Sequence, residues 1–168
     1  RPGRSYRRAL ADEFLARFGA PAPIAVELFG DDVLRRANGL SFGRPQLPTI
    51  DLARSRYVLS FGADFLGIWN SYVAHSHGYG AMRQGRLGVR GVFVQVESRM
   101  SLTGASADHW VAVAPATDGV LALGLAHVIM AAKLASPTGA GRAGRLIEGW
   151  AAGLPDYTPE RVQALTGV

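Results

Sequence analysis

Short apolar runs, separated by stretches of helical periodicity, constrain the fold of this chain most strongly. The runs cover residues 24–29 (IAVELF), 57–62 (YVLSFG), 91–97 (GVFVQVE) and 110–113 (WVAV). They lack a strict alternation of polar and apolar residues, which is typical of parallel strands covered on both faces. The sequence therefore predicts an α/β fold: a doubly wound, mostly parallel and Rossmann-like sheet of about four strands with flanking helices.

The stretches between these runs predict the helices. We expect helices at 4–18, 32–38, 72–84 and 117–135, the third interrupted by Gly78 and Gly80. In the fourth, a broad buried face is expected to hold Val120, Leu121, Leu125, Val128 and Ile129. A last helix is expected to start at Thr158, with Pro159 in its first position. We interpret residues 1–168 as a single domain with a core at 20–135, a Gly-rich connection at 136–145 and a helical tail at 146–168.

Composition excludes several classes of function. The net charge is +5, but the arginines that dominate it are scattered and form no basic block, so we expect no nucleic-acid partner. No apolar run approaches the length of a membrane-spanning helix, so we expect no direct membrane insertion. The chain has no cysteine, which excludes a disulfide framework, a thiolate zinc site, a cysteine-bound iron–sulfur cluster and a cysteine nucleophile within these residues. Its first residues carry no signal peptide, and we read them as the middle of a longer protein.

Three loops that follow predicted strands are the candidate binding segments, because ligands of open parallel sheets lie beyond the carboxyl ends of the strands. They are Gly62-Ala63-Asp64, Glu97-Ser98-Arg99 and Ala116-Thr117-Asp118. A glycine allows close backbone approach to a phosphate, an acidic residue can hold ribose hydroxyls, and Asp118 can accept two hydrogens from guanine. The alternatives are a plain turn for the first loop, a solvated charged pair for the second and helix capping for the third.

Other candidate motifs give weaker signals. No G-x-G-x-x-G follows any predicted strand, so the nicotinamide-dinucleotide fingerprint is missing. His75 and His77 form H-x-H, but no third metal ligand has suitable spacing, and an exposed helix end explains both histidines better. His127 lies in an apolar stretch and is expected to be packed and hydrogen-bonded. We therefore predict no catalytic residue and no metal ligand in this chain.

Residues 51–128 resemble the molybdopterin oxidoreductases of the dimethyl sulfoxide reductase group. The resemblance rests on DLARSRYVLSFGADFLGIW and on GVFVQVESRMSLTGASADHWVAVAPATDGVLALGLAHVI. The family pattern is a strand ending in a glycine-containing loop, an Asp-Pro-Arg-like turn, Thr-Ala…Ala-Asp and Pro-Gly-Thr-Asp. The chain departs from it at Asp64-Phe65, at Glu97-Ser98-Arg99 and at Ala116. Within this group, the sequence is most similar to the molybdopterin-type subunit of alternative complex III. In that subunit the pterin is lost and electrons travel through iron–sulfur clusters.

The resemblance implies an internal fragment of a larger redox subunit that binds bis(molybdopterin guanine dinucleotide), or that derives from one that did. It implies that the nine loop residues above contact this cofactor, and that the partners are the remainder of the subunit, an iron–sulfur subunit and a membrane anchor. A periplasmic or membrane-associated complex is expected. The fragment itself is expected to be inactive and to carry no bound cofactor, since the family's metal ligand and cluster cysteines lie elsewhere. A stand-alone guanine-nucleotide module using Asp118, or a structural interaction domain, are the alternatives.

Overall fold

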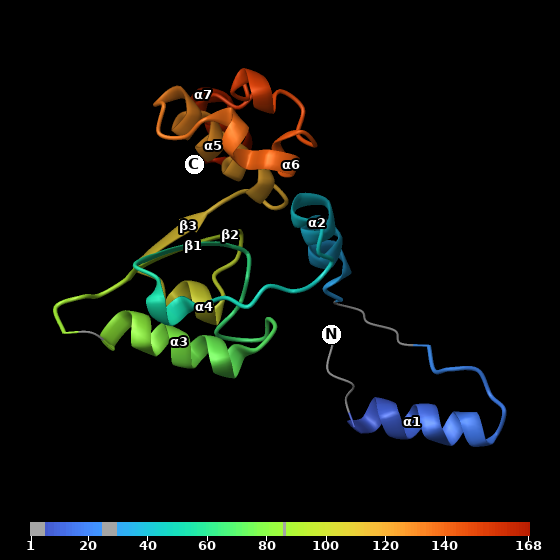
Figure 1. The fold of residues 1–168 in the computed structure, drawn as a ribbon. Helices are drawn as coiled ribbons and strands as arrows, with labels where there is room; N and C mark the ends of the chain where they lie inside the picture. Colours follow the sequence, from blue (N-terminus) through green and yellow to red (C-terminus); the bar gives the residue numbers. More distant parts are fainter. Residues whose placement is uncertain (1–5, 25–29, 86) are drawn as a thin grey trace. The chain divides into compact units, whose positions relative to one another are not determined.

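The computed structural model describes residues 6–24, 30–85 and 87–168, and its contacts divide the chain into two compact units (Figure 1). The first unit is Arg1–Pro48 and the second is Thr49–Val168. All the described strands lie in the second unit. The organisation of the chain as one domain therefore stays a prediction.

Two helices make up the described secondary structure of the first unit: α1 (Tyr6–Arg17) and α2 (Asp32–Phe42). Helix α1 ends before Gly19, whose φ of +64° is a conformation that glycine adopts without strain. Helix α2 runs four residues beyond the expected end at Asn38 and stops at Gly43, which is also left-handed. The strand expected at 24–29 falls on residues 25–29, which lie outside the described residues.

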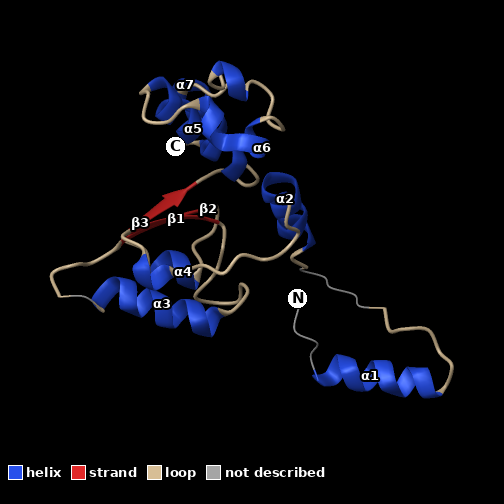
Figure 2. Cartoon of the chain, in the orientation of Figure 1, coloured by secondary structure: helices blue, strands red, loops and turns tan. Residues whose placement is uncertain are grey.

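The second unit contains a parallel sheet, which confirms the predicted α/β class (Figure 2). In the described residues its strands are β1 (Tyr57–Phe61), β2 (Val92–Glu97) and β3 (His109–Ala112), in the order β1-β2-β3. Ser60 is the register partner of Gln95, and Glu97 is the partner of Ala112. All three strands lie within a residue of the runs from which they were predicted. Their carboxyl ends therefore share one edge of the sheet.

Helices α3 (Tyr72–Gln84) and α4 (Leu102–Ala105) connect these strands and lie on the same side of the sheet in Figure 1. Between them and β2 is a core of Leu52, Phe65, Met82 and Phe93. Leu52 belongs to a short 3-10 helix, η1 (Leu52–Arg54), which packs on α3. Helix α3 is continuous through Gly78, contrary to the predicted interruption. A side chain at Gly78 would meet the Leu52 Cβ at 3.2 Å, so this glycine allows η1 to approach closely.

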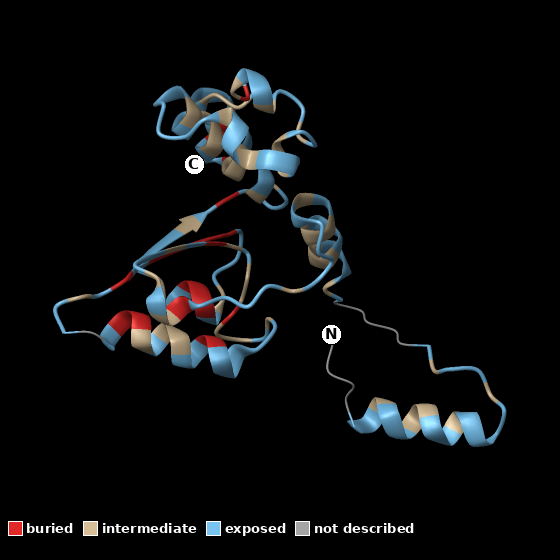
Figure 3. Ribbon diagram, in the orientation of Figure 1, coloured by how far each residue is buried: buried red, intermediate tan, exposed pale blue. Residues whose placement is uncertain are grey.

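Burial varies along the strands (Figure 3), and the residues of the other face of the sheet differ in exposure. Because side chains alternate along a strand, Val92, Val94 and Val96 point away from the face that holds Phe93. Val94 and Val96 are buried, whereas Val92 is exposed and so are Tyr57 and Leu59 on the neighbouring strand. Burial on this face therefore increases along β2 toward its carboxyl end, next to the candidate loops.

The chain after β3 is helical. Its elements are α5 (Asp118–Ala131), η2 (Pro137–Ala140), α6 (Gly141–Gly144), η3 (Trp150–Ala152) and α7 (Pro159–Thr166). Helix α7 begins at Pro159 after Thr158, as the sequence predicts. Helix α5 packs on α7 where Val162 comes so close to Gly124 that an added Cβ would lie 2.7 Å from it. Among the described residues, no helix has the length and apolarity needed to cross a membrane.

The prediction of which α5 residues form its buried face is wrong. Leu125, Val128 and Ile129 are 39%, 45% and 42% exposed, and Gly124 is the residue of this helix that is buried. Apolar residues occur on every side of α5, so its sequence carries no preferred direction for packing. The side that meets α7 was selected by the glycine, which has no side chain to keep the helices apart.

Candidate functional site

The three candidate loops lie at one edge of the sheet, where the parallel strands end. The Gly62 N–H donates to the Val96 carbonyl at 2.8 Å, which joins the first loop to β2. The Val113 N–H donates to the Glu97 carbonyl at 3.4 Å, which continues the pairing of β3 with β2 toward the third loop. The first two loops are thus joined through the ends of neighbouring strands, the third follows β3 at the same edge, and the binding role of all three stays a prediction.

In the first loop, Asp64 is turned into the protein. Gly62 is left-handed, with φ of +64°, and directs the chain off the end of β1. The Asp64 Oδ1 accepts a hydrogen bond of 2.6 Å from the Thr103 hydroxyl, which in turn accepts the Leu66 N–H at 2.9 Å. A Cβ at Gly67 would lie 2.3 Å from Asp64 Oδ2, so the turn closes tightly on this carboxylate. Ala63 is half-buried, and its carbonyl accepts from the Gln95 amide at 3.5 Å.

In the second loop, Glu97 is buried, with 7% of its surface exposed. Its Oε1 accepts from the Ser101 N–H at 2.6 Å and from the Trp110 indole N–H at 3.2 Å. Its Oε2 accepts from the Gln95 amide at 3.0 Å. These donors satisfy both carboxylate oxygens from within the chain. The alternative of a solvated charged pair is thus wrong for Glu97.

Ser98 and Arg99 differ from Glu97, since both are exposed. The described residues give the Arg99 guanidinium no ion pair. Next to them, Ser101 caps the short helix α4 by accepting the Gly104 N–H at 3.0 Å. Two backbone N–H groups at this helix start, those of Ser101 and Gly104, are therefore already used by Glu97 and Ser101.

In the third loop, Ala116 has a φ of +63°, a left-handed conformation that costs an L-residue with a Cβ roughly 1–2 kcal/mol. Glycine is the residue of the similar Pro-Gly-Thr-Asp pattern at this position, so the loop keeps a glycine conformation without the glycine. The Thr117 hydroxyl donates to the Ala114 carbonyl at 2.7 Å and makes no capping bond to α5, so the expected capping role of Thr117 is wrong.

Asp118, the first residue of α5, is half-buried, and no described residue hydrogen-bonds or pairs with its carboxylate. It differs in this respect from Asp64 and Glu97, whose carboxylates are engaged. The loop that carries it is held in place by the Ala114 N–H, which donates to the Thr166 carbonyl of α7 at 2.9 Å. Asp118 is thus the acidic loop residue that stays available to a ligand.

The histidines lie in different surroundings. His75 is buried and stacks on Trp69 with a centroid distance of 5.6 Å, so the expected explanation by an exposed helix end is wrong for it. His77 is exposed, in agreement with that explanation. The His127 Nδ1–H donates to the Gly153 carbonyl at 2.8 Å, which confirms the packed, hydrogen-bonded role. Within the described ranges, no three His, Asp or Glu side chains are grouped as metal ligands.

A charged cluster near the amino end of β2 was missed by the sequence analysis. The Arg83 guanidinium of α3 forms a two-pronged ion pair with Asp108, and its Nη1 also donates to the Gly91 carbonyl at 2.6 Å. Asp108 accepts the Phe93 N–H at 2.8 Å. The hydrogen bonds from Arg83 are the main cause that lowers the pKa of Asp108 to about 2. Because this cluster lies at the end of the strands opposite the loops, we assign it to stability.

These features define the class of the chain: an α/β sheet of the Rossmann-like kind, with the candidate loops after the carboxyl ends of its strands. No family model matches the chain. It is 30% identical over 118 residues, 70% of its length, to the menaquinone reductase molybdopterin-binding-like subunit of Nitratidesulfovibrio vulgaris. It is 28% identical over 141 residues to the arsenate respiratory reductase molybdopterin-containing subunit of Shewanella sp. (strain ANA-3).

The chain is similar to a region of molybdopterin oxidoreductase subunits, and this confirms the family to which its motifs point. It spans 16% of the length of each of these two relatives.

Proposed function

We propose that this chain forms one wall of a molybdopterin-type oxidoreductase subunit that works in electron transfer, and that its third loop contacts the guanine end of a molybdopterin guanine dinucleotide. Two observations support the proposal. The relatives carry molybdopterin in their names, and Asp118 is the acidic loop residue whose carboxylate no described residue engages.

The first two loops support a dinucleotide site less directly than the third. Phosphates are commonly bound by free backbone N–H groups at loops and helix starts. Here the N–H groups of Gly62, Leu66, Ser101 and Gly104 all have acceptors within the chain. The carboxylates of Asp64 and Glu97 add negative charge that would repel a phosphate. Hydrogen bonds within the chain therefore stabilise these two loops.

The third loop fits the guanine end of the dinucleotide. A carboxylate at the start of α5 can accept two parallel hydrogen bonds from the N1 and N2 groups of guanine, which is a strong, charge-assisted arrangement. The cofactor would supply the redox chemistry at its metal, whose ligand lies outside this chain. The role of this chain is to position the nucleotide end. We extend the proposal to the remainder of the subunit, an iron–sulfur subunit and a membrane anchor as partners, in a periplasmic or membrane-associated complex.

The proposal is tested on the subunit that contains this chain by the variant Asp118→Asn. The amide keeps the shape of the side chain but places a donor against a guanine donor, and losing one such charged bond costs about 1–3 kcal/mol. We expect a loss of guanine nucleotide released on acid denaturation, whereas a role in helix stability alone would lower the thermal midpoint and leave the nucleotide bound. Asp156→Asn is the matched control, because Asp156 is exposed and lies outside the three candidate loops.

Two results would overturn the proposal. Full nucleotide occupancy with a lowered thermal midpoint in Asp118→Asn would assign the residue to helix stability. A wild-type subunit that releases no guanine nucleotide would mean that the wall is only derived from a cofactor-binding one. Tight binding of free guanine nucleotide by the 168-residue chain alone would instead favour a stand-alone nucleotide module.

A further inference from the structure

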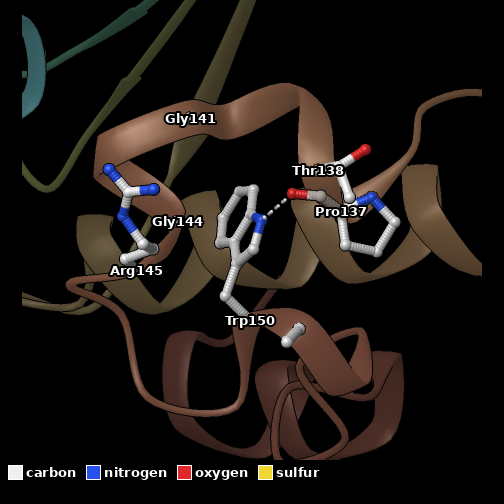
Figure 4. Close-up of a pocket in the computed structure, with 7 residues that line it drawn as sticks. Pro137, Thr138, Gly141, Gly144, Arg145 and Trp150 are labelled. Atoms are coloured by element: carbon white, nitrogen blue, oxygen red, sulfur yellow. Dashed lines mark hydrogen bonds between the residues drawn. The ribbon is translucent and has the colours of Figure 1, made fainter.

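The Gly-rich connection contains a cavity that the proposed function does not use (Figure 4). Its volume is about 460 Å³, and it is lined by Pro137, Thr138, Gly141, Gly144, Arg145, Trp150 and Ala151. All of these residues lie in one stretch of the second unit. We propose that this cavity is a binding site for a flat aromatic ring that carries an acidic group, a carboxylate or a phosphate.

Trp150 provides the surface for the ring. Its indole N–H donates to the Pro137 carbonyl at 2.8 Å, which fixes the orientation of the side chain. Figure 4 shows the indole standing between Arg145 on one side and Pro137 and Thr138 on the other. A Cβ at Gly144 would lie 2.8 Å from the indole, so glycine is needed for the wall to come this close. An aromatic ring fixed in this way is a ready partner for stacking.

Arg145 provides the charge. It is exposed, and neither the ion pairs nor the side-chain hydrogen bonds of the described residues involve its guanidinium. It does not lie over the Trp150 ring in a cation–π contact, since the contact of this kind in the described residues joins Arg83 and Tyr79. A guanidinium presents paired N–H donors that match a carboxylate or a phosphate. The lining holds no acidic residue to compete for it.

The size of the cavity agrees with such a ligand. A closed cavity of about 150 Å³ accepts benzene. The volume here leaves room for one or two fused rings together with the acidic group. A ring without an acid would leave Arg145 unused, and an acid without a ring would leave the indole face uncovered.

The experiment titrates the full chain with 2-naphthoate and 2-naphthyl phosphate, and follows the indole N–H signals of its three tryptophans by NMR. We expect the Trp150 signal, assigned with Trp150→Phe, to shift while the signals of Trp69 and Trp110 stay in place. The neutral 2-naphthamide should bind about tenfold more weakly, the effect of losing one hydrogen bond to a charged group. The two acids distinguish a carboxylate ligand from a phosphate ligand.

Arg145→Gln should reduce the affinity for the acids to that for the amide. Arg142→Gln is the matched control, because Arg142 is a neighbouring arginine outside the lining and should leave the affinity unchanged. Equal binding of acid and amide, an unchanged affinity in Arg145→Gln, or shifts confined to Trp69 or Trp110 would each overturn the proposal. So would the absence of binding by a folded wild-type chain.

Discussion

Replacing Asp108 by asparagine should lower the stability of the second unit and change its dependence on pH. Asp108 is 27% exposed, and its partner Arg83 is 6% exposed, so the pair is mostly shielded from solvent. A pKa lowered from 3.8 to about 2 corresponds to roughly 2–3 kcal/mol of stability, at ~1.36 kcal/mol for each pH unit. We expect Asp108→Asn to lose about this free energy of unfolding at pH 7.

The sign of the pH effect follows from the lowered pKa. A carboxyl whose pKa is lower in the folded state contributes fully above its unfolded value, and this contribution is lost as the pH falls toward the folded value. The wild-type chain should therefore lose its advantage over Asp108→Asn between about pH 4 and pH 2. Because the pKa of Arg83 is raised, the guanidinium stays charged over this range.

The assay is urea-induced unfolding at a series of pH values, with wild-type, Asp108→Asn and the control Asp156→Asn measured together. Asp156 forms an exposed pair with Arg161, which should contribute less than about 1 kcal/mol. A constant difference between wild-type and Asp108→Asn down to pH 2 would refute the reasoning. An equal effect of the two substitutions at pH 7 would refute it as well.

Three further predictions concern the candidate loops, and each is checked by urea-induced unfolding at pH 7. Gly104→Ala should destabilise the chain by about 1–3 kcal/mol, because a Cβ there would lie 2.1 Å from Glu97 Oε1; unchanged stability would contradict the packing described. Ala116→Gly should stabilise the chain by about 1 kcal/mol through relief of the left-handed backbone, and a loss of stability would argue against that conformation. Glu97→Gln should cost about 1–3 kcal/mol, because its amide group faces donors such as the Trp110 indole; a neutral effect would mean that Glu97 is not buried as found.

The sequence predicted the sheet well, but not the hydrogen-bond partners of the loop carboxylates. The apolar runs at β1, β2 and β3 located the strands within a residue, because burial in a parallel sheet leaves a clear local pattern. Asp64 and Glu97 lie at the predicted edge of the sheet, but their hydrogen-bond partners within the chain were not predicted. The partner of Asp64 is Thr103, 39 residues further along the chain, and no local pattern announces such a bond.

The charged cluster and helix α5 are two further cases in which local sequence patterns did not predict a contact between residues far apart in the chain. Arg83 and Asp108 are 25 residues apart, and neither stands out from the other charged residues by its spacing. Helix α5 is apolar on every side, so its periodicity could not select the face that packs on α7. A search for glycines that admit a neighbouring helix would have indicated Gly124.

The bond between the Ala114 N–H and the Thr166 carbonyl has a practical consequence for anyone who trims this protein for expression. It fastens the third loop to the final helix, and Val162 of the same helix fills the space beside Gly124. A boundary placed ahead of Pro159 would keep every strand and all nine loop residues, yet it would release the loop that carries Asp118. Domain boundaries chosen from the sheet alone would then produce a folded sheet whose third loop has lost its anchor.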